Sequence, residues 1–517
     1  MNTKLSFAEK VSRLRTRLRD SEWRRYGALL VSGKLTAIGL LLVAMAFINP
    51  DLLGLSAHAA DPQLKGNDIV NPINTVWTLV AAFLVFGMQV GFTMLEAGFC
   101  RSRETVNVLM ECVVDTCLCG VLFYAWGFAF MFSHGSGFIG SNWFFLQGAP
   151  ATYEGTGVAF LAVWIFQFAF ADTCSTITSG AMIGRTGWIG DLLYSFCVSG
   201  FIYPIIGHWT WGPDGFLATM GTKDGFLPWV GTGFHDFAGS TVVHSIGGAI
   251  ALAGAIVLGP RLGRKFKRDG GGPMLPHDLT IAVSGGLLLW FGWYGFNPGS
   301  TLSAMDFVGI GRVAANTTLA ACAAGLVAML VAWIPNRKWD VSFTTNGFLA
   351  GLVAITCPCY WVSPTGSILI GVVAGVLVYF GVELLEYLRI DDPIGAVPVH
   401  MMNGIWGTLS LGLFASGEFG ATGNFAPDNS APLKGLFYGG GMQLFTAQFI
   451  GSAITCIATF AVAMVVMGGL NAVGLLRVSK EGELEGLDLH EHGISAYPEY
   501  VISSVVTPAA MTIARER

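Results

Sequence analysis

Asp236-Phe-Ala-Gly-Ser-Thr-Val-Val-His244 is a short segment that recurs later in the chain as Asp392-Pro-Ile-Gly-Ala-Val-Pro-Val-His400. Both copies follow the pattern D-x-x-G-x-x-x-V-H, and each opens an apolar stretch long enough to form a helix. Where the segment is helical, a rise of about 1.5 Å per residue puts the histidine about 12 Å beyond its aspartate. The repeat therefore predicts two histidines at corresponding depths in two related halves.

The composition places these halves in a membrane. Of the 517 residues, 53% are hydrophobic and 12% are charged, whereas soluble domains carry about 25% charged residues. Crossing a bilayer takes about 20 apolar residues. From residue 74 onward the sequence offers eleven such stretches, at 74–100, 105–132, 157–182, 188–210, 237–258, 278–297, 312–334, 342–357, 365–386, 395–415 and 440–470. We expect an all-α membrane protein with eleven transmembrane helices and a transmembrane domain over residues 70–470.

The two repeated segments open the fifth and the tenth of these stretches, so they begin at opposite faces of the membrane. This placement predicts two inverted five-helix halves plus a peripheral eleventh helix, an arrangement found in many transporters. Small residues at helical spacing, such as Gly371 and Gly375, predict close helix packing in lipid. The ten cysteines lie mostly in apolar stretches and are interpreted as small buried hydrophobic residues, and no chemistry is assigned to Cys357 and Cys359.

The basic residues predict the orientation. One set of loops carries thirteen Lys and Arg residues and the other carries three, and the basic set is expected in the cytoplasm. Nine basic residues within 1–34, an apolar run at 35–47 and the small-residue site Ala57-His58-Ala59 are typical of a signal peptide. We expect residues 1–59 to be removed, the mature N-terminus to lie outside, and residues 471–517 to form a cytoplasmic tail at the plasma (inner) membrane.

A histidine pair inside a membrane supports several kinds of chemistry. Ionisable groups are costly there and usually face a cavity or each other. Neutral imidazoles pass protons or hydrogen-bond a small solute, and a pair of them can also ligate haem. The acidic residues Glu96, Asp115 and Asp172 also lie within spans. They are interpreted as hydrogen-bonding groups between helices, with a proton route as the alternative.

Aromatic residues gather near the predicted outer ends of three spans. Aromatic faces attract cations, and a hydroxyl group accepts a hydrogen bond from an N–H group. This combination favours a small ammonium-like cation over the alternative of ordinary interfacial aromatics. The residues concerned are Phe166, Phe170, Tyr203, Trp211, Trp293, Phe296 and Ser300.

Four segments together resemble the Amt branch of the Amt/Mep/Rh ammonium transporter family, in its bacterial form. They begin at Phe86-Gly-Met-Gln-Val-Gly-Phe-Thr-Met-Leu-Glu96, at Asp236, at Gly292-Trp-Tyr-Gly-Phe-Asn-Pro-Gly-Ser300 and at Asp391-Asp-Pro. The resemblance covers about residues 70–497 and includes the tail motif Gly486-Leu-Asp488 with His492-Gly493 and Ala496-Tyr497.

The resemblance implies a role for each residue of the site. Phe170 and Phe296 are similar to the gate of the pore, and Phe170, Trp211 and Ser300 to the site that recruits ammonium, with Asp236 as an acidic residue below the vestibule. His244 and His400 are similar to the pore histidines. Phe166, Tyr203 and Trp293 are similar to the flanking aromatics. The resemblance also implies a homotrimer and, at the cytoplasmic face, a PII-type signalling protein.

The expected function is transport of ammonium or ammonia, with possible net charge movement. The leading alternative is an ammonium sensor or receptor on the same fold, which usually carries a fused signalling domain that the 47-residue tail is too short to hold. A haem electron carrier is disfavoured because the sequence offers a single histidine pair, and an intramembrane hydrolase lacks a GxSxG or HExxH motif. With a net charge of -5 the chain has no basic footprint for nucleic acid. No enzyme activity, metal or cofactor is expected.

Overall fold

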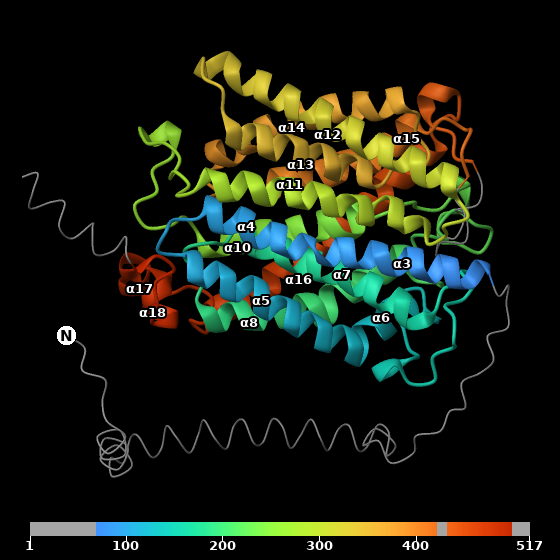
Figure 1. Cartoon of the computed structure of the whole chain (residues 1–517), viewed down its shortest axis with the longest axis horizontal. Coiled ribbons are helices and arrows are strands. Elements are labelled where there is room, and N and C mark those ends of the chain that lie inside the picture. The colour runs from blue at the N-terminus through green and yellow to red at the C-terminus, as the bar shows by residue number, and fades with distance from the viewer. Residues whose placement is uncertain (1–68, 421–431, 499–517) are drawn as a thin grey trace, which may run out of the picture. The chain divides into compact units, whose positions relative to one another are not determined.

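The computed structural model describes residues 69–420 and 432–498. The predicted signal peptide, residues 1–59, and residues 499–517 lie outside the described residues. The described chain is almost entirely helical, and its long helices pack side by side in one bundle (Figure 1). Two short strands, β1 (Gly135–Ser136) and β2 (Ile139–Gly140), pair antiparallel in a loop.

The first half of the bundle contains five helical rods, most of them built from consecutive helices. They are α3 (Val70–Phe86) with α4 (Met88–Phe99); α5 (Thr105–Leu122), η2 (Phe123–Gly127) and α6 (Phe128–Phe132); α7 (Phe160–Gly180); α8 (Trp188–Cys197), η4 (Val198–Ile202) and α9 (Tyr203–Trp211); and η6 (Ser240–Ser245) with α10 (Ile246–Leu258).

The second half and the tail complete the bundle. The second half contains α11 (Leu279–Phe296) with η8 (Pro298–Thr301), α12 (Phe307–Asn336), α13 (Val341–Thr356), α14 (Pro364–Leu388), and η9 (Val397–Met402) with α15 (Asn403–Phe414). After it come α16 (Gln443–Ala472) and the tail helices α17 (Lys480–Glu485) and α18 (Leu487–His492). The loops hold four short 3-10 turns, η3 (Phe144–Leu146), η5 (Pro228–Val230), η7 (Lys267–Asp269) and η10 (Leu436–Tyr438).

Each of the eleven stretches expected to span the membrane contains a helix. Among the described residues, nine continuous helices are long and apolar enough to cross a membrane. The helix α13 has 16 residues and falls short of that length, and the combined η9 and α15 rod is not among the nine. The all-helical membrane fold is therefore as expected, while the count of eleven spans stays a prediction.

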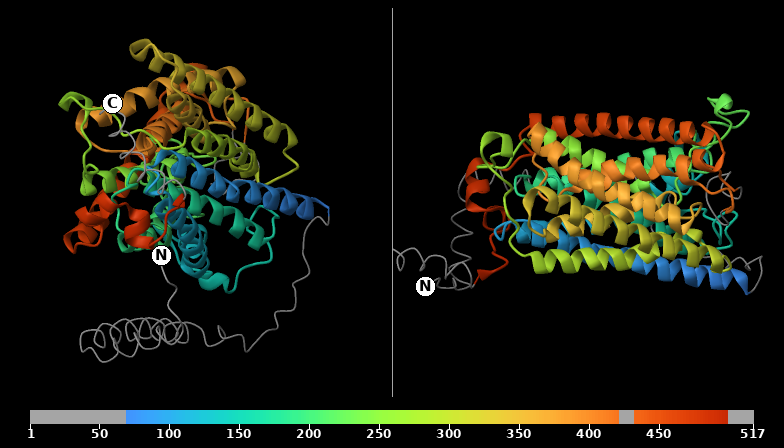
Figure 2. Two further views of the ribbon diagram at one scale, coloured as in Figure 1. Left: turned by 60° about the vertical axis from the view of Figure 1, so that its left-hand side comes forward. Right: turned by 90° about the horizontal axis from the view of Figure 1, so that it is seen from above.

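Small residues let helices α12, α13 and α14 approach closely. A side chain at Gly371 would lie 2.3 Å from the carbonyl oxygen of Ala320, and one at Gly375 would lie 2.5 Å from that of Ala324. By contrast, α16 lies along the margin of the bundle (Figure 2). Only 33% of its most apolar window is buried, against 83% for α7. The windows of α12 and α14 are little more buried, at 39% each, so the peripheral eleventh helix stays a prediction.

The cysteines follow the expectation only in part. Seven of the ten are buried and Cys197 is partly buried, but Cys117 and Cys322 are exposed on the bundle surface. Both lie on long apolar helices, so the hydrophobic surroundings that the sequence indicates are those of a lipid-facing surface. All ten thiols are free, including those of Cys357 and Cys359.

The tail packs against the basic loops at one end of the bundle (Figure 1). The Gly187 N–H donates to the Leu476 carbonyl, and the Asp488 N–H donates to the Arg103 carbonyl. The ring of His277 contacts the hydroxyl of Tyr497 at 3.1 Å. We call this end the inner face and the end with β1 and β2 the outer face, as the distribution of basic residues predicts.

Candidate functional site: a column of rings through the bundle

The repeated segments form two capping turns of the same design. The Asp236 carboxylate accepts hydrogen bonds from the N–H groups of Gly239, Ser240, Thr241 and Val242, at 2.8–3.0 Å. The Asp392 carboxylate accepts from Gly395, Ala396 and Val397, at 2.9–3.1 Å. A carboxylate at this position satisfies the N–H groups that a helix leaves unpaired at its N-terminus.

Glycine is required within both turns. Gly239 has a φ of 111° and Gly395 a φ of 79°, in the left-handed region that glycine enters without steric cost. The helical turns that follow, η6 and η9, are π-helical and carry His244 and His400. The D-x-x-G pattern therefore encodes a cap, and the first residues of each segment are not helical as the depth argument assumed.

His244 and His400 meet inside the bundle. Their Nδ1 atoms are 3.2 Å apart, and their rings stack at a centroid distance of 5.2 Å with 20° between the planes. Such a hydrogen bond needs one protonated and one unprotonated nitrogen, so the two neutral rings adopt different tautomers. The Nε2 atom of His244 has no partner among the described residues. The pair therefore keeps hydrogen-bonding capacity for a small polar solute.

Aromatic rings continue the histidine pair toward the outer face. Trp293 stacks on His244 at 5.2 Å and 16°, and Phe296 lies at 5.4 Å and 29° from the same ring. The indole of Trp293 is held in place by its N–H, which donates to the Thr356 hydroxyl at 2.9 Å. The next ring is Phe170, which stacks on Phe296 with centroids 4.0 Å apart.

The contact between Phe170 and Phe296 closes the column. Their ring planes differ by 23°, and both side chains are buried. Two rings in direct contact leave no room for a solute between them, so passage requires at least one ring to rotate. Phe166 packs against Phe170 at 4.7 Å and 47°.

The outer end of the column is a small polar and aromatic cup. Trp211 lies edge-on to Phe170 at 6.0 Å, and its indole N–H donates to the Asp236 carbonyl at 2.7 Å. The hydroxyl of Ser300 donates to the Phe296 carbonyl at 2.8 Å, which leaves its lone pairs free to accept from an N–H donor. The Asp236 carboxylate already accepts four backbone N–H groups.

Two further residues bear on the column. Tyr203 is buried in the same apolar core as the column rings, and its place as a flanking aromatic stays a prediction. Phe92 was not predicted, yet its ring lies 6.5 Å from that of His400 and extends the column inward. Phe92 stands within the segment from Phe86 to Glu96 that carries the resemblance, but a single phenylalanine in an apolar helix carries no signal of its own.

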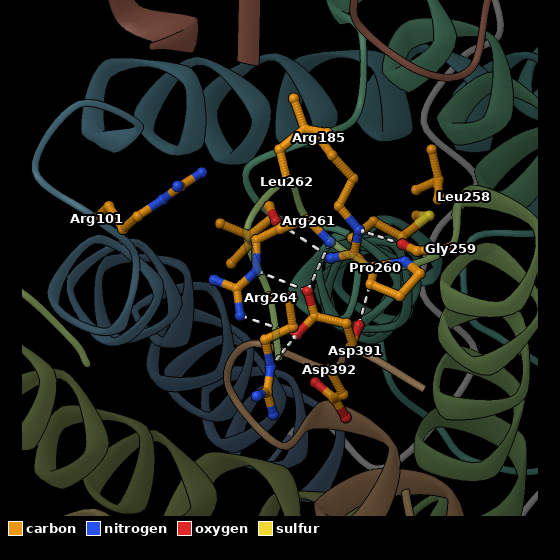
Figure 3. A network of polar contacts seen from close by, with 12 residues as sticks. Arg101, Arg185, Leu258, Gly259, Pro260, Arg261, Leu262, Arg264, Asp391 and Asp392 are labelled. Carbon is orange, nitrogen blue, oxygen red and sulfur yellow. Dashed lines mark hydrogen bonds and ion pairs between the residues drawn. The ribbon is translucent and has the colours of Figure 1, made fainter. Parts of the chain in front are cut away.

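At the inner face, a buried ion-pair network holds the start of the η9 turn (Figure 3). Arg261 binds both carboxylate oxygens of Asp391, at 2.8 and 2.9 Å, and Arg185 donates to the Asp391 carbonyl at 2.5 Å. Burial disfavours the charged form of Asp391, but the hydrogen bond from Arg261 and the charges of Arg261 and Arg185 outweigh it and hold the Asp391 pKa well below its usual range. The network fixes Asp391 beside the Asp392 cap.

A cavity of about 210 Å³ opens beside this network. Its lining includes Phe99, Arg264, Asn346, Asp392 and Pro398. Two of these residues, Asp392 and Pro398, belong to the segment that carries His400. The positive charge of Arg264 at the cavity is compensated by an ion pair with Glu386.

The helical bundle and the buried ring column define a membrane transporter of the Amt/Mep fold. The sequence model described as "Ammonium Transporter Family" matches residues 76–497, and the chain therefore belongs to that family.

Individual relatives agree with this assignment. Ammonium transporter Amt2 of Archaeoglobus fulgidus is 42% identical over 478 residues, which is 92% of this chain and 97% of that protein. Ammonium transporter 1 member 3 of Solanum lycopersicum is 37% identical over 443 residues, 83% of this chain and 94% of that protein. Among solved structures, a "Sensor Amt Protein" has a TM-score of 0.72 and 34% identity, covering 82% of this chain and 99% of that one. Candida albicans Mep2 has a TM-score of 0.70 and 28% identity, covering 82% and 90%.

Proposed function

We propose that this protein moves ammonium nitrogen across a membrane, and that the ring column is its pathway. The observation that carries the proposal is the unbroken series of buried rings from Trp211 to His400, with the histidine pair at its inner end. Two of the relatives named above, Amt2 of Archaeoglobus fulgidus and ammonium transporter 1 member 3 of Solanum lycopersicum, are described as ammonium transporters, and the chain covers almost the whole length of Amt2.

The dry column selects the form of the substrate. Moving a permanent charge into a low-dielectric interior is costly, whereas neutral ammonia is a small polar solute that a single hydrogen-bonding partner can accommodate. Ammonium binds at the outer cup through cation–π attraction to Trp211 and Phe170 and a hydrogen bond to Ser300, in the field of Asp236. It loses a proton near the Phe170 and Phe296 gate, and ammonia passes the Nε2 atoms of the histidine pair.

Uptake of radiolabelled methylammonium into a transport-deficient host tests this function. Wild-type protein is expected to support uptake, and Trp211→Leu and His400→Ala are expected to reduce it. A matched control is Trp209→Leu, because Trp209 is on the same helix but its indole donates to the Phe138 carbonyl outside the column. Equal uptake by all four proteins would exclude the column as the pathway.

An ammonium sensor is the second candidate function. The observation that favours it is the similarity to the structure described as "Sensor Amt Protein". A sensor binds at the outer cup without turnover, so purified protein in vesicles would bind ammonium but carry no labelled methylammonium inside. Transport at rates well above those of empty vesicles would exclude a purely sensory role.

We also propose the topology and partners that the sequence predicts: eleven spans, an outside mature N-terminus after cleavage at the signal peptide, a cytoplasmic tail, residence in the inner membrane and a homotrimer. A PII-type protein at the inner face fits a tail that packs beside the inner cavity. Pull-downs from nitrogen-replete and nitrogen-starved cells are expected to recover such a protein in one condition. Cysteines placed at loop positions and labelled from one side test the orientation.

A further inference from the structure

Five carboxyl groups lie buried beside the ring column and take no part in it. Each of their side chains is at most 2% exposed. They come from four neighbouring helices, α4, α5, α7 and α8, and we call them the carboxyl cluster. Its members are Glu96, Glu111, Asp115, Asp172 and Asp191.

The carboxyl cluster has no cationic partner. In the part of the chain that the structure describes, none of the five forms an ion pair with Lys, Arg or His. Ionising all five would place several negative charges close together in a low-dielectric interior, which is strongly unfavourable. The cluster must therefore retain protons.

The members are near one another as well as being buried. Asp191 interacts electrostatically with Glu96, Glu111 and Asp115, and Asp115 also interacts with Asp172. The carboxyl cluster extends from Asp172, in the middle of α7, to Glu111, which lies two turns from the inner end of α5.

Two polar atoms in the cluster are left without partners. One carboxyl oxygen each of Glu111 and Asp191 lacks a hydrogen-bond partner within the described residues. Asp172 interacts with the side chains of Thr116 and Gln89, and Asp115 interacts with that of Ser195. Buried polar atoms are nearly always satisfied, so the two unpaired oxygens indicate a missing ligand of hydrogen-bonding character. A proton shared between oxygens, or a water that carries it, meets that need.

The remaining hydrogen bonds hold the carboxyl groups in line. Ser179 donates to Glu96 at 3.3 Å and Ser175 donates to Asp115 at 3.5 Å. These two bonds join α7 to α4 and α5, as expected for acids that link helices. Other carboxyl oxygens of the cluster, on Glu111 and Asp191, keep no hydrogen-bond partner among the described residues. The linking role therefore does not account for the carboxyl cluster as a whole.

The inner end of the cluster meets the tail. The Asn107 amide donates to Glu111 at 2.7 Å, and its carbonyl oxygen accepts from His492 Nε2 of α18 at 2.9 Å. Burial lowers the His492 pKa, and the charges of Asp488 and Glu491 oppose that effect only in part. The Asn107 amide therefore ties the inner end of the cluster to the tail but does not itself pass a proton.

We propose that Asp172, Asp115, Asp191 and Glu111 form a proton path beside the histidine column, with Glu111 as its last carboxyl group before the cytoplasmic face. Each transfer breaks an O–H bond on one carboxyl group and forms one on the next, so the vacancy moves outward as the proton moves inward. The proton comes from ammonium at the outer cup, so this inference rests on the proposed function. The path lets ammonia and its proton cross by separate routes.

Infrared difference spectroscopy on the full-length protein in D2O tests the path directly. The carbonyl band of protonated carboxyl groups should shift on exchange with deuterium, and it should lose intensity in Asp115→Asn and Glu111→Gln. Asp269→Asn is the matched control, because Asp269 forms an exposed surface pair with Arg389. A band that does not exchange in the wild type would overturn the proposal.

Ammonium-evoked current across vesicles holding the purified protein provides the second readout. Asp115→Asn and Glu111→Gln are expected to lose the current while keeping labelled methylammonium equilibration and wild-type thermal stability. Wild-type current in both variants would overturn the path and leave the transport function standing. If the wild type carries no current or label, the transport function fails, and the infrared exchange alone then decides whether the cluster is a proton site.

Discussion

The two aspartate caps of the repeated segments offer a quantitative test of the capping explanation. Asp236 accepts four backbone N–H groups, Asp392 accepts three, and Asp278, which caps α11, accepts one, from Ile281. Replacing each aspartate with asparagine keeps one acceptor oxygen and turns an amide NH2 toward the remaining N–H groups. The number of bonds lost therefore differs among the three caps although the substitution is identical.

The magnitudes follow from the bond counts. A hydrogen bond to a charged group contributes about 1.5–3 kcal/mol. Asp236→Asn loses two bonds, a cost of about 3–6 kcal/mol, and Asp392→Asn loses one, about 1.5–3 kcal/mol. Asp278→Asn keeps its single bond, and asparagine is itself a good helix cap, so its cost should be only a few tenths of a kcal/mol.

Apparent unfolding temperatures of the three purified variants should fall in the order Asp236→Asn, Asp392→Asn, Asp278→Asn, with the first the lowest. The same heating rate must be used throughout, because irreversible unfolding makes the midpoint depend on it. A value for Asp278→Asn as low as that for Asp236→Asn would refute the capping explanation. So would an Asp392→Asn variant that is less stable than Asp236→Asn.

Three further predictions concern binding, packing and pH. Trp211→Leu removes a cation–π contact of about 0.5–2 kcal/mol, so the concentration for half-maximal methylammonium uptake should rise about 2- to 30-fold; an unchanged value would count against the outer cup. Gly371→Ala places a methyl group 2.3 Å from the Ala320 carbonyl oxygen, whereas at Gly468 a methyl group would meet no atom within 4 Å. Gly371→Ala should therefore lower the unfolding temperature, and Gly468→Ala should raise it slightly through helix propensity. Equal changes of unfolding temperature in the two variants would contradict the close approach of Gly371 to Ala320. Hydrogen bonds to Glu154 and Asp214 raise the His134 pKa, so the stability they contribute is full below the unfolded value of about 6.5 and is lost as pH rises through the higher folded value. The exchange protection of residues 134–140, measured relative to the intrinsic rate at each pH, should therefore fall on that rise in the wild type. It should stay constant with pH in His134→Gln.

Local sequence patterns predicted much of the fold, because the length of an apolar stretch depends only on the residues within it. Apolar length located the helices, and the repeated D-x-x-G-x-x-x-V-H pattern paired the two histidines, whereas the capping role of its aspartates was not predicted. The π-helical form of the turns was not predictable, because it depends on how η6 and η9 pack against each other. Nor was the number of spans settled, since α13 is shorter than a full crossing and its placement depends on its neighbours.

The site shows the same division. His244 and His400 were paired by position in the repeat, and the structure places their rings in contact. Phe92 and the carboxyl cluster were not assigned to any site, because a lone phenylalanine or a single acid in an apolar helix looks the same whether or not it faces a partner. Only the arrangement of four helices brings Glu111 and Asp191 beside the acids noted in the sequence.

The passage of ammonia along the histidine pair is tested most directly by ammonium-evoked current and labelled methylammonium uptake in vesicles that hold purified His244→Ala protein. Because the substitution removes the ring that stacks on Trp293, Phe296 and His400, both signals should fall toward those of empty vesicles, or the current that remains should lose its selectivity for ammonium. Undiminished, ammonium-selective current and uptake would show that substrate crosses without the imidazole pair.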